Sequence, residues 1–136
     1  MFLKPAVEIV GLASATSANG TARNGATLAT YGIEPGSLMI KCYANVKTSS
    51  VLATFKVQVS DDGTNWYDLI DGGTAVSEAT ASGTGSDVET RYAFTLPDVS
   101  GFKNVRGVAT LSGAATAAAD LTKVDYKFRT YGADAI

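Results

Sequence analysis

Seven short segments of the sequence alternate between apolar and polar residues, and this period of two constrains the fold more than any other feature. The segments are rich in Val, Thr, Tyr and Phe, which favour extended strands. No window shows an apolar repeat at helical spacing. The predicted strands cover residues 6–12, 37–45, 53–60, 65–70, 91–96, 104–112 and 123–132, and a weaker segment at 26–32 gives an eighth. The alanine-rich residues 112–120 are predicted to form a connecting turn, with at most one helical turn.

Two long segments of low complexity separate these predicted strands. Residues 14–26 and 71–90 consist mainly of Gly, Ser, Thr, Ala and Asn, and neither has an apolar pattern of its own. Loops of this length in a compact domain are usually binding loops or arms. Seven to eight antiparallel strands with such loops favour an all-β fold, a single β-sandwich that is jelly-roll-like or immunoglobulin-like. This domain is predicted to span residues 1–136, with a short N-terminal arm at about residues 1–6.

Composition and charge exclude several classes of function. Eleven Lys and Arg face thirteen Asp and Glu, a net charge of −2. No basic field is therefore available to bind nucleic acid, and no stretch approaches the ~20 apolar residues of a membrane span. Charged residues make up 18% of the chain, below the roughly 25% of an ordinary domain, and a surface poor in charge suits a protein packed against neighbours. Pro5 opens the apolar run at the start and Glu8 interrupts it, so the run is too weak for a secretion signal and we expect none.

The sequence offers no constellation of catalytic residues. It has no histidine, which removes the commonest general base and metal ligand. Its single cysteine, Cys42, lies in an apolar run and is predicted to be a buried thiol. No phosphate loop, nucleophile motif or calcium-loop pattern is present, and no two carboxylates are placed to work across a cleft. We therefore predict that the protein is not an enzyme and has no catalytic, cofactor-binding or metal-binding residues.

The segment FKVQVSDDGTNWYDL, at residues 55–69, predicts two strands joined by a tight turn. Asp61 and Asp62 fit a type I turn, and Gly63 supplies the positive φ that closes a three-residue loop with a bulge. The register that follows pairs Ser60 with Thr64, Val57 with Tyr67, Phe55 with Leu69, Lys56 with Asp68 and Gln58 with Trp66. Trp66 then faces outward, where it is either covered by a loop or the arm, or available as an interface anchor or a platform for stacking a sugar.

This hairpin and two later segments resemble small structural proteins of tailed bacteriophages. The later segments are RYAFTLPDVSGFKNVRGVATLSG, at residues 91–113, and KVDYKFRTYG, at residues 123–132. The resemblance is strongest to capsid cement or decoration proteins with a jelly-roll or sandwich domain, and it covers residues 37–132. The SDDGxNW hairpin also occurs in discoidin-like carbohydrate-binding sandwiches, although this chain lacks their frequent cysteine pair. A tail or baseplate protein of the same virus class is the third interpretation.

The resemblance to cement proteins implies a structural function. Such proteins bind the outer capsid surface, bridge neighbouring capsomers and stabilise the shell, so the implied partner is the major capsid protein. The implied location is the surface of a virion assembled in the host cytoplasm, and self-association as a homodimer or trimer is expected because oligomers favour closed symmetry. The candidate partner-binding residues are Phe2, Leu3, Arg23, Trp66, Lys103 and Arg106. The alternatives are an arm that adds an edge strand, and a solvated strand edge at Lys103 and Arg106.

Overall fold

A computed structural model of the chain describes residues 5–17, 20–71, 74–75, 79–83, 89–97, 99, 101–112 and 120–130. Within these residues the chain forms strands and no helix, so this part contains no apolar helix that could cross a membrane. The strands are β1 (Val7–Ala15), β2 (Ala22–Asn24), β3 (Leu28–Ala29), β4 (Met39–Val46), β5 (Leu52–Ser60), β6 (Tyr67–Asp68), β7 (Ile70–Asp71), β8 (Thr74–Ala75), β9 (Ala79–Ser82), β10 (Glu89–Thr95), β11 (Asn104–Ser112) and β12 (Asp120–Phe128).

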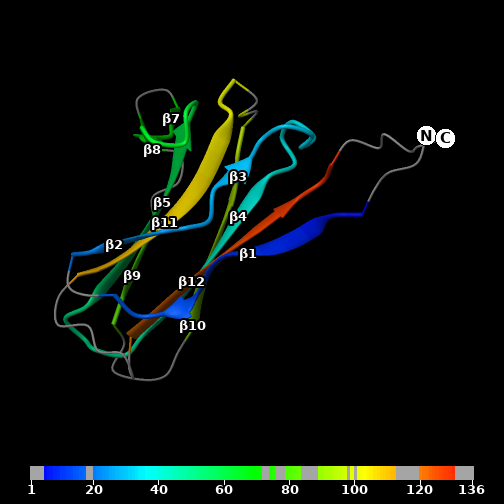
Figure 1. Ribbon diagram of the computed structural model, residues 1–136. Helices are drawn as coiled ribbons and strands as arrows, with labels where there is room; N and C mark the ends of the chain where they lie inside the picture. Colours follow the sequence, from blue (N-terminus) through cyan, green and yellow to red (C-terminus); the bar gives the residue numbers. More distant parts are fainter. Residues whose placement is uncertain are drawn as a thin grey trace.

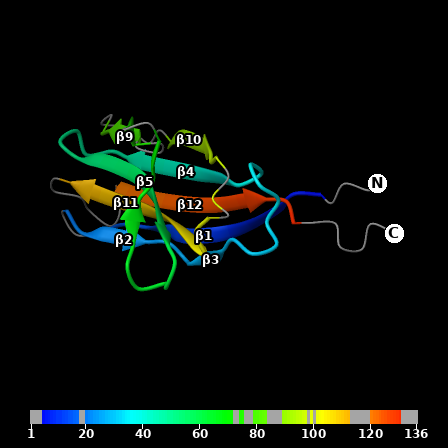
Figure 2. The same cartoon turned by 90° about the horizontal axis from the view of Figure 1, so that it is seen from above.

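The strands form a sandwich of two antiparallel sheets (Figures 1 and 2). One sheet has the order β1-β12-β4-β10. The other has the order β2-β11-β5-β6, and β3 also pairs with β11 while β9 also pairs with β5. A short ribbon of β7 and β8 stands beside them.

The strand order is that of a jelly roll. β2 and β3 pair with the same strand and count as one strand position, and so do β6 and β9. The chain then has eight strand positions in sequence order, and the β7-β8 ribbon is left out of this count. The first position then pairs with the eighth, the second with the seventh, the third with the sixth and the fourth with the fifth. This is a long hairpin rolled into a sandwich. The prediction of an all-β, jelly-roll-like sandwich is therefore confirmed.

The core lies between the two sheets because alternate residues of the long strands point inward. Strand β4 shows the pattern most regularly, with every second residue buried from Ile40 to Val46. The facing strand β5 does the same, and its Phe55 is fully buried. Cys42 is part of this core, and burial raises the pKa of its thiol to about 12. The prediction that Cys42 is a buried thiol is thus confirmed.

The predicted strand boundaries are wrong at several places. The predicted strand 65–70 is divided into β6 and the start of β7, and β12 begins at Asp120 instead of residue 123. Strand β1 continues to Ala15, the predicted loops 14–26 and 71–90 contain the short strands β2, β8 and β9, and β12 ends at Phe128 instead of residue 132. The short strands pair with their neighbours through backbone hydrogen bonds, which need no apolar alternation. The predicted arm residues Phe2 and Leu3 lie outside the described residues, and so do residues 113–119 of the predicted turn at 112–120, whose ends Ser112 and Asp120 belong to β11 and β12.

Tyr126 fills the space between the sheets and forces its neighbours to be small. Its ring is fully buried, and its hydroxyl accepts a hydrogen bond from Gly107 N (3.0 Å) and donates one to Ala26 O (2.8 Å). A Cβ atom on Gly11 would lie 2.6 Å from the ring, closer than van der Waals contact allows. Glycine at positions 11 and 25 therefore reflects close packing around Tyr126, whereas a Cβ atom on Gly107 would lie 2.9 Å from Val124 Cγ1.

Asp120 ties the turn after β4 to the start of β12. Its carboxylate is fully buried and accepts hydrogen bonds from Lys47 N (3.0 Å), Thr48 N (3.0 Å) and Thr48 Oγ1 (2.7 Å). A buried carboxylate is tolerated when donors surround it in this way. Asp120 is therefore a structural residue that fixes the turn between β4 and β5.

Candidate partner-binding surface

The turn between β5 and β6 is organised by the carboxylate of Asp62. Its Oδ1 accepts hydrogen bonds from Asn65 N (2.7 Å) and Thr64 N (2.8 Å), and its Oδ2 accepts one from Asn65 Nδ2 (2.7 Å). These bonds, led by the one from Asn65 N, lower the pKa of Asp62 far below its ordinary value. Gly63 has a φ of 74°, which confirms the predicted positive φ.

The predicted register of this hairpin is wrong by two residues. Gln58 pairs with Asp68 and Val59 with Tyr67, so residues 61–65 form the loop. The reason is that Asp62 binds the amides of Thr64 and Asn65, which keeps those residues out of the ladder. Two residues are one full period of a strand, so each side chain stays on its predicted face. The predicted contact of Lys56 with Asp68 is confirmed, with Nζ 3.2 Å from Oδ1.

Substitution of Gly63 tests the turn. We expect Gly63→Val to lower the free energy of unfolding by about 2 kcal/mol, because a β-branched residue resists the left-handed conformation. Gly63→Asn is the matched control and should cost less than about 1 kcal/mol, since Asn tolerates positive φ. Urea denaturation followed by Trp66 fluorescence measures both. Equal stability of the two variants would contradict this account of the turn.

Five side chains on the outer face of β5, β6 and β11 form a connected group that we call the Trp66 cluster: Lys56, Gln58, Trp66, Asp68 and Arg106. The guanidinium carbon of Arg106 lies 4.1 Å from the centroid of the Trp66 ring. Arg106 Nε and Nη2 both donate to Gln58 Oε1, at 3.0 and 2.8 Å. Gln58 Nε2 in turn donates to Asp68 Oδ1 (3.0 Å), which completes a chain of contacts to Lys56.

The cluster presents a pre-organised aromatic and cationic surface. Trp66 Nε1 donates to Gly63 O at 3.3 Å, so the indole is held from the turn as well as by Arg106. Partial burial lowers the pKa of Arg106, although an arginine stays charged at neutral pH. The hydrogen bond from Gln58, ahead of the contacts with Lys56, lowers the pKa of Asp68. Because their contacts with one another fix these groups in geometry, the cluster suits binding.

The other predicted site residues lie elsewhere. Arg23, on β2, donates to Ala15 O (3.0 Å), Thr122 O (3.0 Å), Thr122 Oγ1 (3.0 Å) and Ala13 O (2.6 Å). It therefore joins the edge of one sheet to the edge of the other. Lys103 is exposed in the turn before β11, outside the cluster. Of the predicted residues that the structure describes, it brings together Trp66 and Arg106, and partner binding by any of the predicted residues stays a prediction.

Sequence reasoning missed Gln58 as a member of the site. Arg106 faces Gln58 in the pairing of β11 with β5, and the two residues are far apart in the chain. Alternation alone places both on outer faces, but the pairing of these two strands is a tertiary fact that no local pattern encodes. The signal available in the sequence was that Gln58 and Trp66 are both predicted to face outward in the same hairpin.

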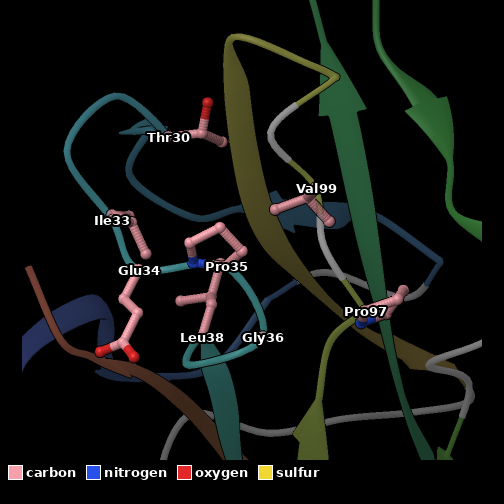
Figure 3. Close-up of a pocket in the computed structure, with 8 residues that line it drawn as sticks. All are labelled: Thr30, Ile33, Glu34, Pro35, Gly36, Leu38, Pro97 and Val99. Carbon is pink, nitrogen blue, oxygen red and sulfur yellow. The ribbon is translucent and has the colours of Figure 1, made fainter. Parts of the chain in front are cut away.

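A small depression lies between the loop that joins β3 to β4 and the chain that follows β10 (Figure 3). Its lining is largely apolar: Thr30, Ile33, Glu34, Pro35, Gly36, Leu38, Pro97 and Val99. The Thr30 hydroxyl donates to Phe102 O at 2.6 Å, and the Glu34 carboxylate points away from Val99. No three His, Cys, Asp or Glu side chains of the described residues gather where they could hold a metal.

The fold and the Trp66 cluster together define a jelly-roll β-sandwich with an aromatic and polar outer face. The chain is similar in structure to a chain of infectious bursal disease virus, Gx strain, with a TM-score of 0.59 and 11% sequence identity over 96% of this chain and 33% of that chain. It therefore spans about a third of the viral chain. At this identity the likeness shows the fold alone, and it agrees with the sandwich described above.

Weaker structural similarities were also found. A chain of the Gt strain of the same virus gives a TM-score of 0.49 with 8% identity over 95% of this chain and 32% of that chain. FLHE gives 0.37 with 14% identity over 92% of this chain and 96% of that chain. No protein-family model and no curated protein matches the sequence.

Proposed function

We propose that the protein is a structural component of a virion that binds the outer capsid surface of a tailed bacteriophage and stabilises the shell by bridging capsomers. The observation that carries this proposal is the Trp66 cluster, a fixed aromatic and cationic surface on the outer face of the sandwich. The sequence resemblance of the hairpin and the late strands to capsid cement proteins supplies the class of partner, the major capsid protein.

The cluster has the properties of an interface anchor. Trp and Arg are the residues most enriched among those that dominate binding energy. The contacts of Arg106 with Gln58 and of Trp66 with Gly63 already order these side chains, so little conformational entropy is lost when a partner covers them. A contact of about 800 Å² on each partner suffices for specific binding.

Many copies multiply the effect of each contact. A shell offers the same site repeatedly, and a protein that contacts two capsomers gains from the high effective concentration of the second site. We propose that the chain self-associates at symmetry axes of the shell and has no enzymatic activity.

Two other functions remain as outcomes of the test. A carbohydrate-binding module would have to stack a sugar on the face of Trp66 that Arg106 does not cover. A tail or baseplate protein would bind a tail tube or ring instead of the shell. Glycan binding by the isolated protein, or its recovery with tails and not with heads, would replace the proposal.

The direct test uses purified capsids of the virus that encodes the chain, prepared without this protein. We expect Trp66→Ala to weaken co-sedimentation with these capsids by at least about 30-fold, the loss typical of an anchor residue. Arg106→Ala should also weaken binding. Arg91→Ala is the matched control, because Arg91 lies 5.4 Å from the Tyr43 ring centroid in a similar contact on the other sheet. Equal binding by all three variants would contradict the proposed surface.

A further inference from the structure

The first half of β1 is an open sheet edge with apolar side chains. β1 is the outermost strand of its sheet and pairs with β12 along one side. The aliphatic side chains of Val7, Ile9 and Val10 are 41%, 39% and 57% exposed. In the described part of the chain, no strand or side chain bonds to the other side of residues 7–10. An open apolar edge of this kind is a template for pairing with another chain.

The second half of the same strand is closed. Gly11 O accepts a hydrogen bond from Ala26 N at 2.8 Å, and Arg23 binds the carbonyls of Ala13 and Ala15. Register shifts after Val10 also bend the strand there. The open edge is therefore limited to the segment that ends at Val10.

The other sheet edges are protected in the ways that soluble proteins use. β10, at the opposite edge of the same sheet (Figure 2), carries the exposed charges of Glu89 and Arg91. At the edges of the second sheet, β2, β3, β6 and β9 are only two to four residues long. Among the described edges, the start of β1 is thus the one whose exposed side chains are mostly aliphatic.

The charged residues beside this edge indicate which kind of strand can pair with it. Val7 and Ile9 pair with the core residues Phe128 and Tyr126, so they point to the inner side, while Glu8 lies on the outer side, 2.7 Å from Lys41. Continuing the β1–β12 register by one residue places the small Ala6 beside the exposed Arg129. An acidic residue that lies opposite Ala6 on an incoming strand would therefore face Arg129 on the far side of Ala6. The short side chain of Ala6 leaves room for an ion pair between them.

A second copy of β1 provides such a residue in one register. A two-fold axis perpendicular to the sheet places the outer faces of the two copies on the same side of the joined sheet. The residue at this axis lies directly opposite the same residue of the second copy. With the axis at Val7, Glu8 of the second copy opposes Ala6 and faces Arg129, and Ile9 opposes Pro5. The inner face of the junction is then entirely apolar.

The neighbouring registers are less favourable. With the axis at Glu8, two carboxylates oppose each other directly, which destabilises an antiparallel pair. With the axis at Ile9, Glu8 of the second copy lies opposite Val10, which pairs with the acidic Asp125, so two carboxylates come near each other. This register would also need pairing beyond Val10, where Ala26 N already bonds to Gly11 O.

We propose that two copies of the chain associate through antiparallel pairing of their β1 edges about a two-fold axis at Val7, which joins two four-stranded sheets into one continuous sheet. This proposal rests on the self-association that is part of the proposed function and specifies its interface. It is tested on the free protein, without capsids. Loss of capsid binding and loss of the dimer are therefore separate results.

Single cysteines test the axis. We expect Val7→Cys to form a disulfide-linked dimer at least about fivefold more than Glu8→Cys or Ile9→Cys under mild oxidation, because only a residue on the axis brings its own copy within the Cα separation a disulfide needs. The native Cys42 stays out of the reaction because its thiol is buried, with a pKa of about 12. Absence of a preferred cross-link at Val7, as when another segment covers the edge, would overturn the proposal.

A charge exchange provides an independent test. Arg129→Glu should weaken the dimer about tenfold in sedimentation, because the change acts twice in a two-fold interface. The double variant Glu8→Arg with Arg129→Glu should restore most of the association. A monomeric wild-type protein, or a double variant no better than Arg129→Glu alone, would also overturn the proposal.

Discussion

Gly25→Ala is expected to destabilise the protein by about 3 kcal/mol and to lower its melting temperature by about 10 °C. The new Cβ atom would lie 2.6 Å from Gly107 O and against the hydroxyl of Tyr126. A backbone oxygen cannot turn aside as a flexible side chain can, so the chain at position 25 must move. That movement strains the bond from Gly25 N to Gly107 O (2.8 Å).

Urea denaturation measures this effect, and Gly101→Ala is the matched control. No atom lies within 4 Å of a Cβ built on Gly101, so the control should change stability by less than about 0.5 kcal/mol. An unchanged m value would show that Gly25→Ala alters stability and not the extent of unfolding. A Gly25→Ala protein as stable as the control would contradict the tight packing around Tyr126.

Asp120→Ala is expected to cost about 3 to 4 kcal/mol, the largest effect of a single side-chain truncation that we predict. The change leaves Lys47 N, Thr48 N and Thr48 Oγ1 without their acceptor in a partly buried turn. Each unpaired buried donor costs about 1 to 3 kcal/mol, reduced where water can enter.

Asp120→Asn separates the hydrogen bonds from the charge. Its amide oxygen can still accept from Lys47 N and Thr48 N, while its NH2 group takes the place of the oxygen that accepts from Thr48 Oγ1. One accepted hydrogen bond and the charge are then lost, so we expect an intermediate loss of about 2 kcal/mol. Thermal unfolding of the three proteins gives the order wild type, Asp120→Asn, Asp120→Ala. The same stability for Asn and Ala would show that the accepted hydrogen bonds contribute little.

Strands with regular alternation were predictable from the sequence, and strands fixed by distant partners were not. The alternation in 37–45, 53–60 and 104–112 predicts β4, β5 and β11 to within about two residues, because one side of each strand is buried. Strand β2 has no such pattern, and Arg23 holds it in place through acceptors up to 99 residues away. The jelly-roll order likewise depends on which strands pair, which local periodicity does not encode.

The candidate site was predictable in its residue types and not in its assembly. The turn sequence predicts Gly63 at positive φ and Trp66 on the outer face, since both follow from the hairpin itself. The register failed because the hydrogen bonds of Asp62 compete with strand pairing, a contest of similar energies that composition does not decide. The contact of Arg106 with Trp66 needed the neighbouring strand β11.

The temperature at which virus particles release their genome tests the central claim most directly. Particles that carry the protein, particles that lack it, and particles to which purified protein has been added back are heated with a dye that fluoresces on free DNA. The account predicts release at a clearly lower temperature without the protein and recovery when it is returned, with no recovery for Trp66→Ala. Release at one temperature in all the preparations would contradict a role in holding the shell together.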